Sequence, residues 1–139
     1  MQTTLDPDLT AAPQIAPADL KQIRAEGYRS VISNRPDGET PDQPGAAEVR
    51  AAAEAAGLLF AHIPVVGGAI TDADVDAFRR ALDTLPGPIF GFCRTGTRTT
   101  TLWALAHAAD TDADALIATA RAAGYDLSAL RPRLEAVRT

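Results

Sequence analysis

The sequence has 139 residues, of which 46% are hydrophobic and 22% are charged, the composition of one globular domain with its own core. The net charge of −5, from 13 basic and 18 acidic residues, argues against nucleic acid as a partner, because phosphate backbones attract basic surfaces. No apolar run approaches the roughly 18 residues of a membrane span, and the N-terminus lacks the features of a secretory signal. We therefore expect a single cytoplasmic domain over residues 1–139 and no membrane partner.

The chain contains one cysteine, Cys93, so it cannot form an internal disulfide. Its two histidines, His62 and His107, are widely separated and do not complete the usual zinc constellation. Any chemistry at Cys93 is therefore expected to be thiol chemistry, without a metal or a cofactor.

The predicted elements begin with residues 1–12, a polar segment that we interpret as an extended arm or a short edge strand. Apolar spacing and terminating glycines then predict helices at 17–25, 46–56, 71–85 and 99–108, and one or two more from 111 through 137. Apolar and β-branched runs predict strands at 28–33, 58–64 and 89–92.

The alternation of strands and helices predicts an α/β fold, with a central, mainly parallel sheet flanked by helices. In such sheets the ligand crevice lies beyond the carboxyl ends of the strands. Asn34 and Arg35 follow one predicted strand and Cys93 follows another. We therefore expect these residues to meet at one mouth.

The segment Phe92–Thr99, with the sequence FCRTGTRT, connects a predicted strand to a predicted helix. Unpaired backbone N–H groups and the helix dipole favour a thiolate at this position, and Arg94 and Arg98 add positive charge. Gly96 suits the sharp turn that lets the loop amides point inward together. A lone cysteine after an apolar strand is usually a small core residue, but this flanking sequence favours a nucleophile.

The candidate site residues divide into two groups. Cys93 and Arg98 are the catalytic candidates, because the Arg98 guanidinium offers a planar fork of donors to a tetrahedral anion. Thr99 is expected to donate its hydroxyl to the sulfur. The anion-binding candidates are Arg94, Thr95, Gly96, Thr97, Thr99, Asn34 and Arg35.

The Cys93 loop resembles the active loop of single-domain rhodaneses, in which cysteine is followed by two residues, glycine, one residue, arginine, and serine or threonine. The rest of the chain, over roughly residues 13–135, resembles the beta-lactamase hydrolase-like family of small phosphatase-like domains. That resemblance is carried by Gln14-Ile15 with Asp19-Leu20, by Val31–Glu39, by His62–Val65 and by the Cys93 loop. It implies the fold of the dual-specificity tyrosine phosphatases, either phosphatase or sulfurtransferase activity, and occurrence alone or fused to persulfide dioxygenase-type domains.

Three departures from the phosphatase pattern favour sulfur chemistry. The tyrosine phosphatase signature places its arginine six positions after the cysteine, whereas Arg98 stands five positions after Cys93. Phe92 occupies the position where phosphatases commonly have histidine. Phosphatases of this fold also resemble one another in using an aspartate as general acid after the equivalent of Pro64, and this chain has Val65–Gly68 there.

General acid catalysis is typically worth about 100- to 10,000-fold, so its loss penalises an alkoxide leaving group more than sulfite. Asp72 and Asp74 are alternative acids, but both look like residues at the start of a helix.

We therefore expect a sulfurtransferase that takes sulfane sulfur from thiosulfate or a persulfide and passes it, through a Cys93 persulfide, to a thiol such as glutathione or to cyanide. Arg98 and the loop amides would hold the donor anion, Arg94 would guide it in, and a persulfide dioxygenase is the expected protein partner. Two alternatives stay open: a tyrosine-phosphatase-like hydrolase acting through a Cys93 phosphocysteine, and a non-catalytic module that binds an anion or persulfide.

The remaining polar candidates are interpreted as structural. His62 is expected to be a satisfied core histidine, while His107 and Trp103 are expected to pack on the helix after the loop. The segment from Asn34 to Asp37 is either part of the site or a solvated turn. Asp112 and Asp114 are interpreted as charges that complement a helix dipole.

Overall fold

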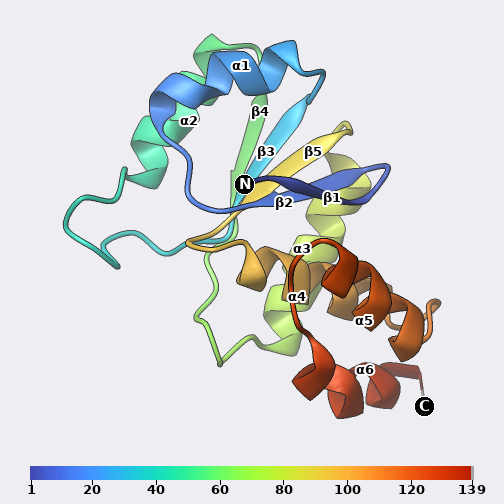
Figure 1. The fold of residues 1–139 in the computed structure, drawn as a ribbon. Coiled ribbons are helices and arrows are strands. Elements are labelled where there is room, and N and C mark those ends of the chain that lie inside the picture. The colour runs from blue at the N-terminus through green and yellow to red at the C-terminus, as the bar shows by residue number, and fades with distance from the viewer. Residues whose placement is uncertain (139) are drawn as a thin grey trace.

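The computed structural model describes residues 1–138 and contains a five-stranded sheet in the order β1-β2-β5-β3-β4 (Figure 1). β1 pairs antiparallel with β2, and every other neighbouring pair is parallel. The predicted α/β fold with a mainly parallel sheet is therefore confirmed. The strands are β1 (Thr3–Asp6), β2 (Leu9–Ala12), β3 (Ser30–Ser33), β4 (Leu59–His62) and β5 (Ile89–Phe92).

Helices cover both faces of this sheet, α1 and α2 on one side and α3 to α6 on the other (Figure 1). None of the helices within residues 1–138 combines the length and the apolarity needed to cross a membrane. The helical elements are the 3-10 turn η1 (Pro17–Asp19), α1 (Leu20–Ala25), α2 (Ala46–Ala55), α3 (Asp72–Thr84), α4 (Thr97–His107), α5 (Ala113–Ala122), the 3-10 turn η2 (Ser128–Leu130) and α6 (Arg131–Arg138).

Two hydrophobic cores form because successive strand residues point to opposite faces of the sheet. Val31 and Phe90 belong to the core under α1 and α2, whereas Ile32 and Ile89 belong to the core under α3 to α6. Since both faces are covered, the central strands appear in the sequence as continuous apolar runs.

The N-terminal segment differs from the expected arm. Residues 3–12 form a hairpin in which β1 is an edge strand and β2 lies inside the sheet, paired with β5. Asp6 holds its turn, because its carboxylate accepts hydrogen bonds from the backbone N–H of Leu9 at 2.9 Å and from Trp103 Nε1 at 2.8 Å. Trp103 is buried in the larger core, and His107 lies beside Asp6, so both pack as structural residues.

Three helix starts also differ in detail. At α3 the Asp74 carboxylate accepts from the Thr71 N–H at 2.9 Å while the Asp74 N–H donates to Thr71 Oγ1 at 3.1 Å, so aspartate completes the reciprocal pair usually made by glutamate or glutamine. α5 begins at Ala113 rather than at position 111, because Asp112 caps it by accepting from the Ala115 N–H at 2.8 Å. α4 begins at Thr97, two residues before its predicted start, because Gly96 adopts the cap position.

Gly91, in the middle of β5, sets how closely α4 approaches the sheet. A Cβ at this position would lie 2.8 Å from Thr99 Cγ2, and Thr99 itself is completely buried. Cys93 lies in the loop that joins β5 to α4. The close approach of these two elements therefore also constrains the geometry of the Cys93 loop.

We predict that Gly91→Ala lowers the free energy of unfolding by about 1 to 3 kcal/mol, because the added methyl overpacks the contact between β5 and α4. In Gly91→Ala/Thr99→Ser the conflicting Cγ2 methyl is removed while the hydroxyl is kept. Urea unfolding of both single variants and the double variant measures the coupling. Losses that simply add in the double variant would contradict this account of the packing.

Candidate active site at Cys93

Cys93 is the first residue after β5 and lies at the base of the loop that leads into α4. Its N–H donates to the Ala12 carbonyl at 3.3 Å, which continues the pairing of β2 with β5. The backbone N–H of Gly96 donates to Cys93 Sγ at 3.0 Å. The sulfur therefore lies inside the curve of the loop, facing a backbone amide at the N-terminus of α4.

The loop closes around Gly96, whose φ of +96° lies in the left-handed region that glycine tolerates. Packing also requires glycine at this position, because a Cβ here would collide with the side chain of Tyr125. The Tyr125 hydroxyl donates to the Thr95 carbonyl at 3.3 Å, and burial raises the pKa of this tyrosine. Sequence reasoning missed Tyr125, since nothing local in the sequence indicates a contact across thirty positions.

Asn34 ties the ends of three strands to the helix that carries the loop. Its side-chain N–H donates to the Ile63 carbonyl at 2.9 Å, and its side-chain oxygen accepts from Thr99 Oγ1 at 2.8 Å. Its backbone N–H donates to the Phe92 carbonyl at 2.8 Å. Thr99, expected to donate to the sulfur, therefore donates to Asn34, and the fully buried Asn34 amide supports the loop from beneath.

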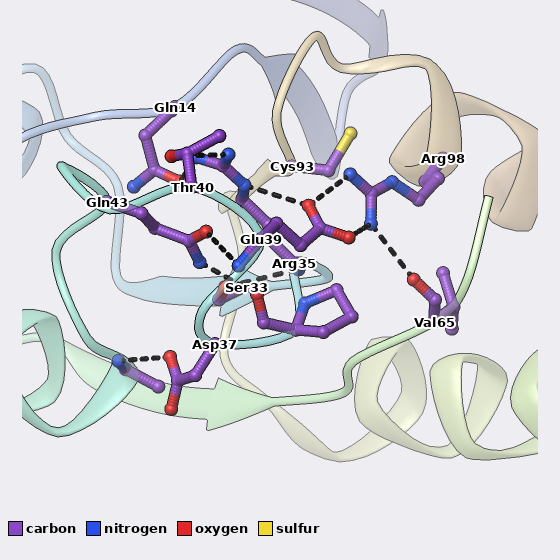
Figure 2. Close-up of polar contacts among 12 residues, drawn as sticks. Gln14, Ser33, Arg35, Asp37, Glu39, Thr40, Gln43, Val65, Cys93 and Arg98 are labelled. Carbon is purple, nitrogen blue, oxygen red and sulfur yellow. Dashed lines mark hydrogen bonds and ion pairs between the residues drawn. The ribbon is translucent and has the colours of Figure 1, made fainter.

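Glu39 lies between two arginines beside the loop (Figure 2). Its carboxylate accepts from both Nη atoms of Arg98 at 2.8 Å and from Arg35 Nε at 3.0 Å. Hydrogen bonding to Arg98, assisted by Arg35, lowers the pKa of Glu39 to about 2. The pKa of Arg98 is raised, first by its bond to Glu39 and then by the nearby Cys93 sulfur, while burial opposes the shift.

Glu39 was included in the Val31–Glu39 resemblance but was not chosen as a site residue. The available local signal was its position four residues after Arg35, but that spacing indicates an ion pair only when the intervening turn is compact. The second partner, Arg98, stands far along the chain and depends on the fold.

The other predicted residues take separate positions. Arg94, Thr95 and Thr97 are exposed on the loop, where Thr95 Oγ1 donates to Thr97 Oγ1 at 3.0 Å. Arg35 is almost fully buried and donates to Gln14 as well as to Glu39. It therefore lies at the carboxyl end of β3 as a residue that positions Glu39.

The turn after β3 is an ordered part of the structure. His62 Nε2 donates to the Arg35 carbonyl at 2.9 Å, as expected for a satisfied structural histidine. Asp37 accepts from the Ala46 N–H at 2.8 Å and so caps α2. Asn34 and Arg35 are therefore buried beside the Cys93 loop, whereas Asp37 is exposed and holds the start of α2.

The acidic candidates after β4 do not lie free beside the sulfur. Asp74 is engaged in the cap of α3, and Asp72 accepts from Arg133 Nη2 at 3.3 Å. Both are helix-start residues, as predicted. Glu39, with its lowered pKa, is ionised near neutral pH and therefore carries no proton to donate.

Comparison with known sequences identifies the family. The model of the family described as "Beta-lactamase hydrolase-like protein, phosphatase-like domain" matches residues 2–110. The chain is 45% identical over 102 residues to a beta-lactamase hydrolase-like protein of Agrobacterium fabrum, and 46% identical over 103 residues to one of Xylella fastidiosa. Each alignment covers 73% of this chain and 24% of the relative, so the chain spans about a quarter of the length of these proteins.

Comparison with solved structures points the same way. A candidate phosphatase from Neisseria meningitidis superposes with a TM-score of 0.88 and 39% identity, covering 97% of this chain and 96% of that chain. P. aeruginosa TpbA in complex with pTyr superposes with a TM-score of 0.64 at 18% identity, covering 96% of this chain and 89% of that chain. This second likeness shows the fold alone, and the fold is that of the tyrosine phosphatases.

The predicted sulfurtransferase activity is wrong, and these comparisons correct it: the chain matches a phosphatase-like family along most of its length and none of the findings indicates a rhodanese. The error came from the spacing between Cys93 and Arg98. This spacing matches the rhodanese loop, but the domain around the loop has the fold of a different family. Here Arg98 is held by Glu39 and by the Val65 carbonyl at 3.1 Å, two contacts that the body of the domain provides.

The family resemblance noted from the sequence is therefore confirmed, without the rhodanese part. The match over residues 2–110, the two bacterial relatives and the whole-chain superposition agree with the geometry around Cys93. The chain belongs to the beta-lactamase hydrolase-like protein family and corresponds to its phosphatase-like domain.

Proposed function

We propose that this domain hydrolyses phosphate monoesters through a phosphocysteine on Cys93. The observation that carries the proposal is the Cys93 loop, in which a backbone N–H faces the sulfur and Arg98 stands beside it at the start of α4. Membership of a phosphatase-like family supports the same chemistry.

The reaction has two steps. The Cys93 thiolate attacks phosphorus, a sulfur–phosphorus bond forms, and the ester P–O bond breaks as the leaving oxygen takes the bonding electrons and then a proton from water. Water then attacks the phosphocysteine, releasing inorganic phosphate and returning the thiolate. Loop N–H groups and Arg98 stabilise the charge on the phosphoryl oxygens in both steps.

Arg98 can still donate to a phosphoryl group, because its bonds to Glu39 and Val65 use only some of its N–H donors and hold the guanidinium in place. A guanidinium has five N–H donors. Glu39 and the Val65 carbonyl accept three of them, two from Nη1 and one from Nη2. The Nε–H and the second Nη2–H form the remaining edge of the group, and Cys93 is the further side-chain partner of Arg98. Such an edge can grip two oxygens of a tetrahedral anion held on the sulfur.

The leaving group receives little help from the protein. Val65–Gly68 contains no acid, Asp74 is engaged in the cap of α3, and Glu39 is ionised. The Asp72 side chain is 99% exposed to solvent and does not line the cavity beside Arg98. The reaction therefore favours leaving oxygens that depart as stable anions, such as phenolates. The pTyr bound in a structure of the same fold supports aryl phosphates as the first substrate class to test.

We predict Cys93-dependent hydrolysis with a strong preference for acidic phenols. Without general acid catalysis, kcat/KM for 4-nitrophenyl phosphate should exceed that for phenyl phosphate by about 100-fold or more. Phosphate release is measured for the wild type and for Cys93→Ser, with thermal unfolding as the folding control. Equal rates for the wild type and Cys93→Ser would refute the proposed function.

We also predict that Glu39→Gln lowers the free energy of unfolding by about 1 to 2 kcal/mol at pH 7, a value reduced by solvent screening of this partly exposed carboxylate. Because the folded-state pKa of about 2 lies below the usual glutamate pKa of 4.5, the contribution is complete above pH 4.5 and declines as the pH falls toward 2.

The measurement is urea unfolding of the wild type and Glu39→Gln at several pH values, with Glu54→Gln, on the exposed face of α2, as the matched control. A difference between wild type and Glu39→Gln that stays constant from pH 6 to pH 3 would contradict the assigned ion pair.

A further inference from the structure

A cavity of about 430 Å³ opens beside the Cys93 loop. Its walls come from three places: Thr97 and Arg98 on the loop side, Gly67 and Ile70 between β4 and α3, and Leu130 and Arg133 from η2 and α6. A volume of this size suits a small organic group. Since Arg98 lies both beside the sulfur and in the wall, the cavity adjoins the position of the phosphoryl group.

The cavity has an apolar part and a second positive charge. Ile70 and Leu130 are half-buried and present hydrocarbon surface to it. The Arg133 guanidinium is anchored by donating to the Ile70 carbonyl through Nη1 at 2.7 Å. No carboxylate is among the cavity-lining residues of the described chain, which include two arginines.

The present partner of Arg133 is easily displaced. Its Nη2 donates to Asp72 at 3.3 Å, but the Asp72 side chain is 99% exposed. An ion pair with such an exposed carboxylate contributes little, because water competes for both groups. An anionic ligand within the cavity therefore has a guanidinium that is fixed in place by one bond and available through the others.

We infer that this cavity binds the leaving group of the substrate and that Arg133 recognises a second anionic group on it. The substrate class is then a phosphate monoester with a compact apolar body that carries a carboxylate or a second phosphate. This inference rests on the proposed function, because it assigns the leaving-group side of the same reaction. Arg133 and Leu130 lie outside the segment 2–110 that the family model matches, so they make this specificity a property of the C-terminal part of the chain.

The test compares kcat/KM for 3-carboxy-4-nitrophenyl phosphate with kcat/KM for 4-nitrophenyl phosphate. We expect the ratio of the two values to fall about 10- to 100-fold in Arg133→Gln, because a hydrogen-bonded charge on the substrate loses its partner. Asp72→Asn should raise the ratio, since it removes the negative charge that competes with the substrate carboxylate for the Arg133 guanidinium. Arg131→Gln is the matched control on the same helix, because Arg131 pairs with Asp114 outside the cavity and its loss should leave the ratio unchanged.

The outcomes separate this inference from the proposed function. If both esters are hydrolysed through Cys93 but the ratio is the same in the wild type and Arg133→Gln, the inference is overturned and the proposed function stands. If neither ester is hydrolysed, the proposed function fails and calorimetry of 3-carboxy-4-nitrophenyl phosphate binding decides the site: weaker binding to Arg133→Gln by a similar factor supports it, and equal binding overturns it.

Discussion

The buried amide of Asn34 is the interaction on which the site depends. It joins the end of β3 to the Ile63 carbonyl after β4 and to Thr99 on α4, while the backbone N–H of Asn34 donates to the Phe92 carbonyl at the end of β5. A buried amide with every group paired favours a single arrangement, whereas the loss of one partner leaves a desolvated group at a cost of about 1 to 3 kcal/mol. The Cys93 loop runs from Phe92 to Thr99, and both of these residues are hydrogen-bonded to Asn34. The shape of the loop therefore depends on the bonds of Asn34.

Local charge explains how an acidic protein can build an anion site. The chain carries a net charge of −5, yet Arg35, Arg94 and Arg98 gather at the carboxyl ends of the strands. Glu39 holds Arg98 from the side while the loop amide faces the sulfur. In the proposed function, the attraction for a phosphoryl group therefore arises from preorganised donors close to Cys93 rather than from the overall field of the protein.

The sequence predicted what local patterns determine. The strands β3 and β5 are fully buried and β4 is a largely apolar edge strand, and glycines mark the ends of the helices between them, so the sheet and the residues at the carboxyl ends of its strands could be predicted. The hairpin of β1 and β2 was harder, because its short strands are interrupted by the polar turn around Asp6. Glu39, Tyr125 and Arg133 act through partners far along the chain, which no local pattern reveals. The function was mispredicted for a related reason: the position of Arg98 in the loop was counted, whereas its orientation is set by Glu39 and Val65.

The most direct test of the account is to trap the covalent intermediate. The wild-type protein is mixed with 4-nitrophenyl phosphate, quenched within the first turnover, and examined by intact mass and peptide mapping. A phosphocysteine intermediate predicts the added mass of one phosphoryl group on the peptide containing Cys93, and no such adduct in Cys93→Ser. Phosphate release in the absence of any phosphoryl group on Cys93, with the same rate in Cys93→Ser, would contradict it.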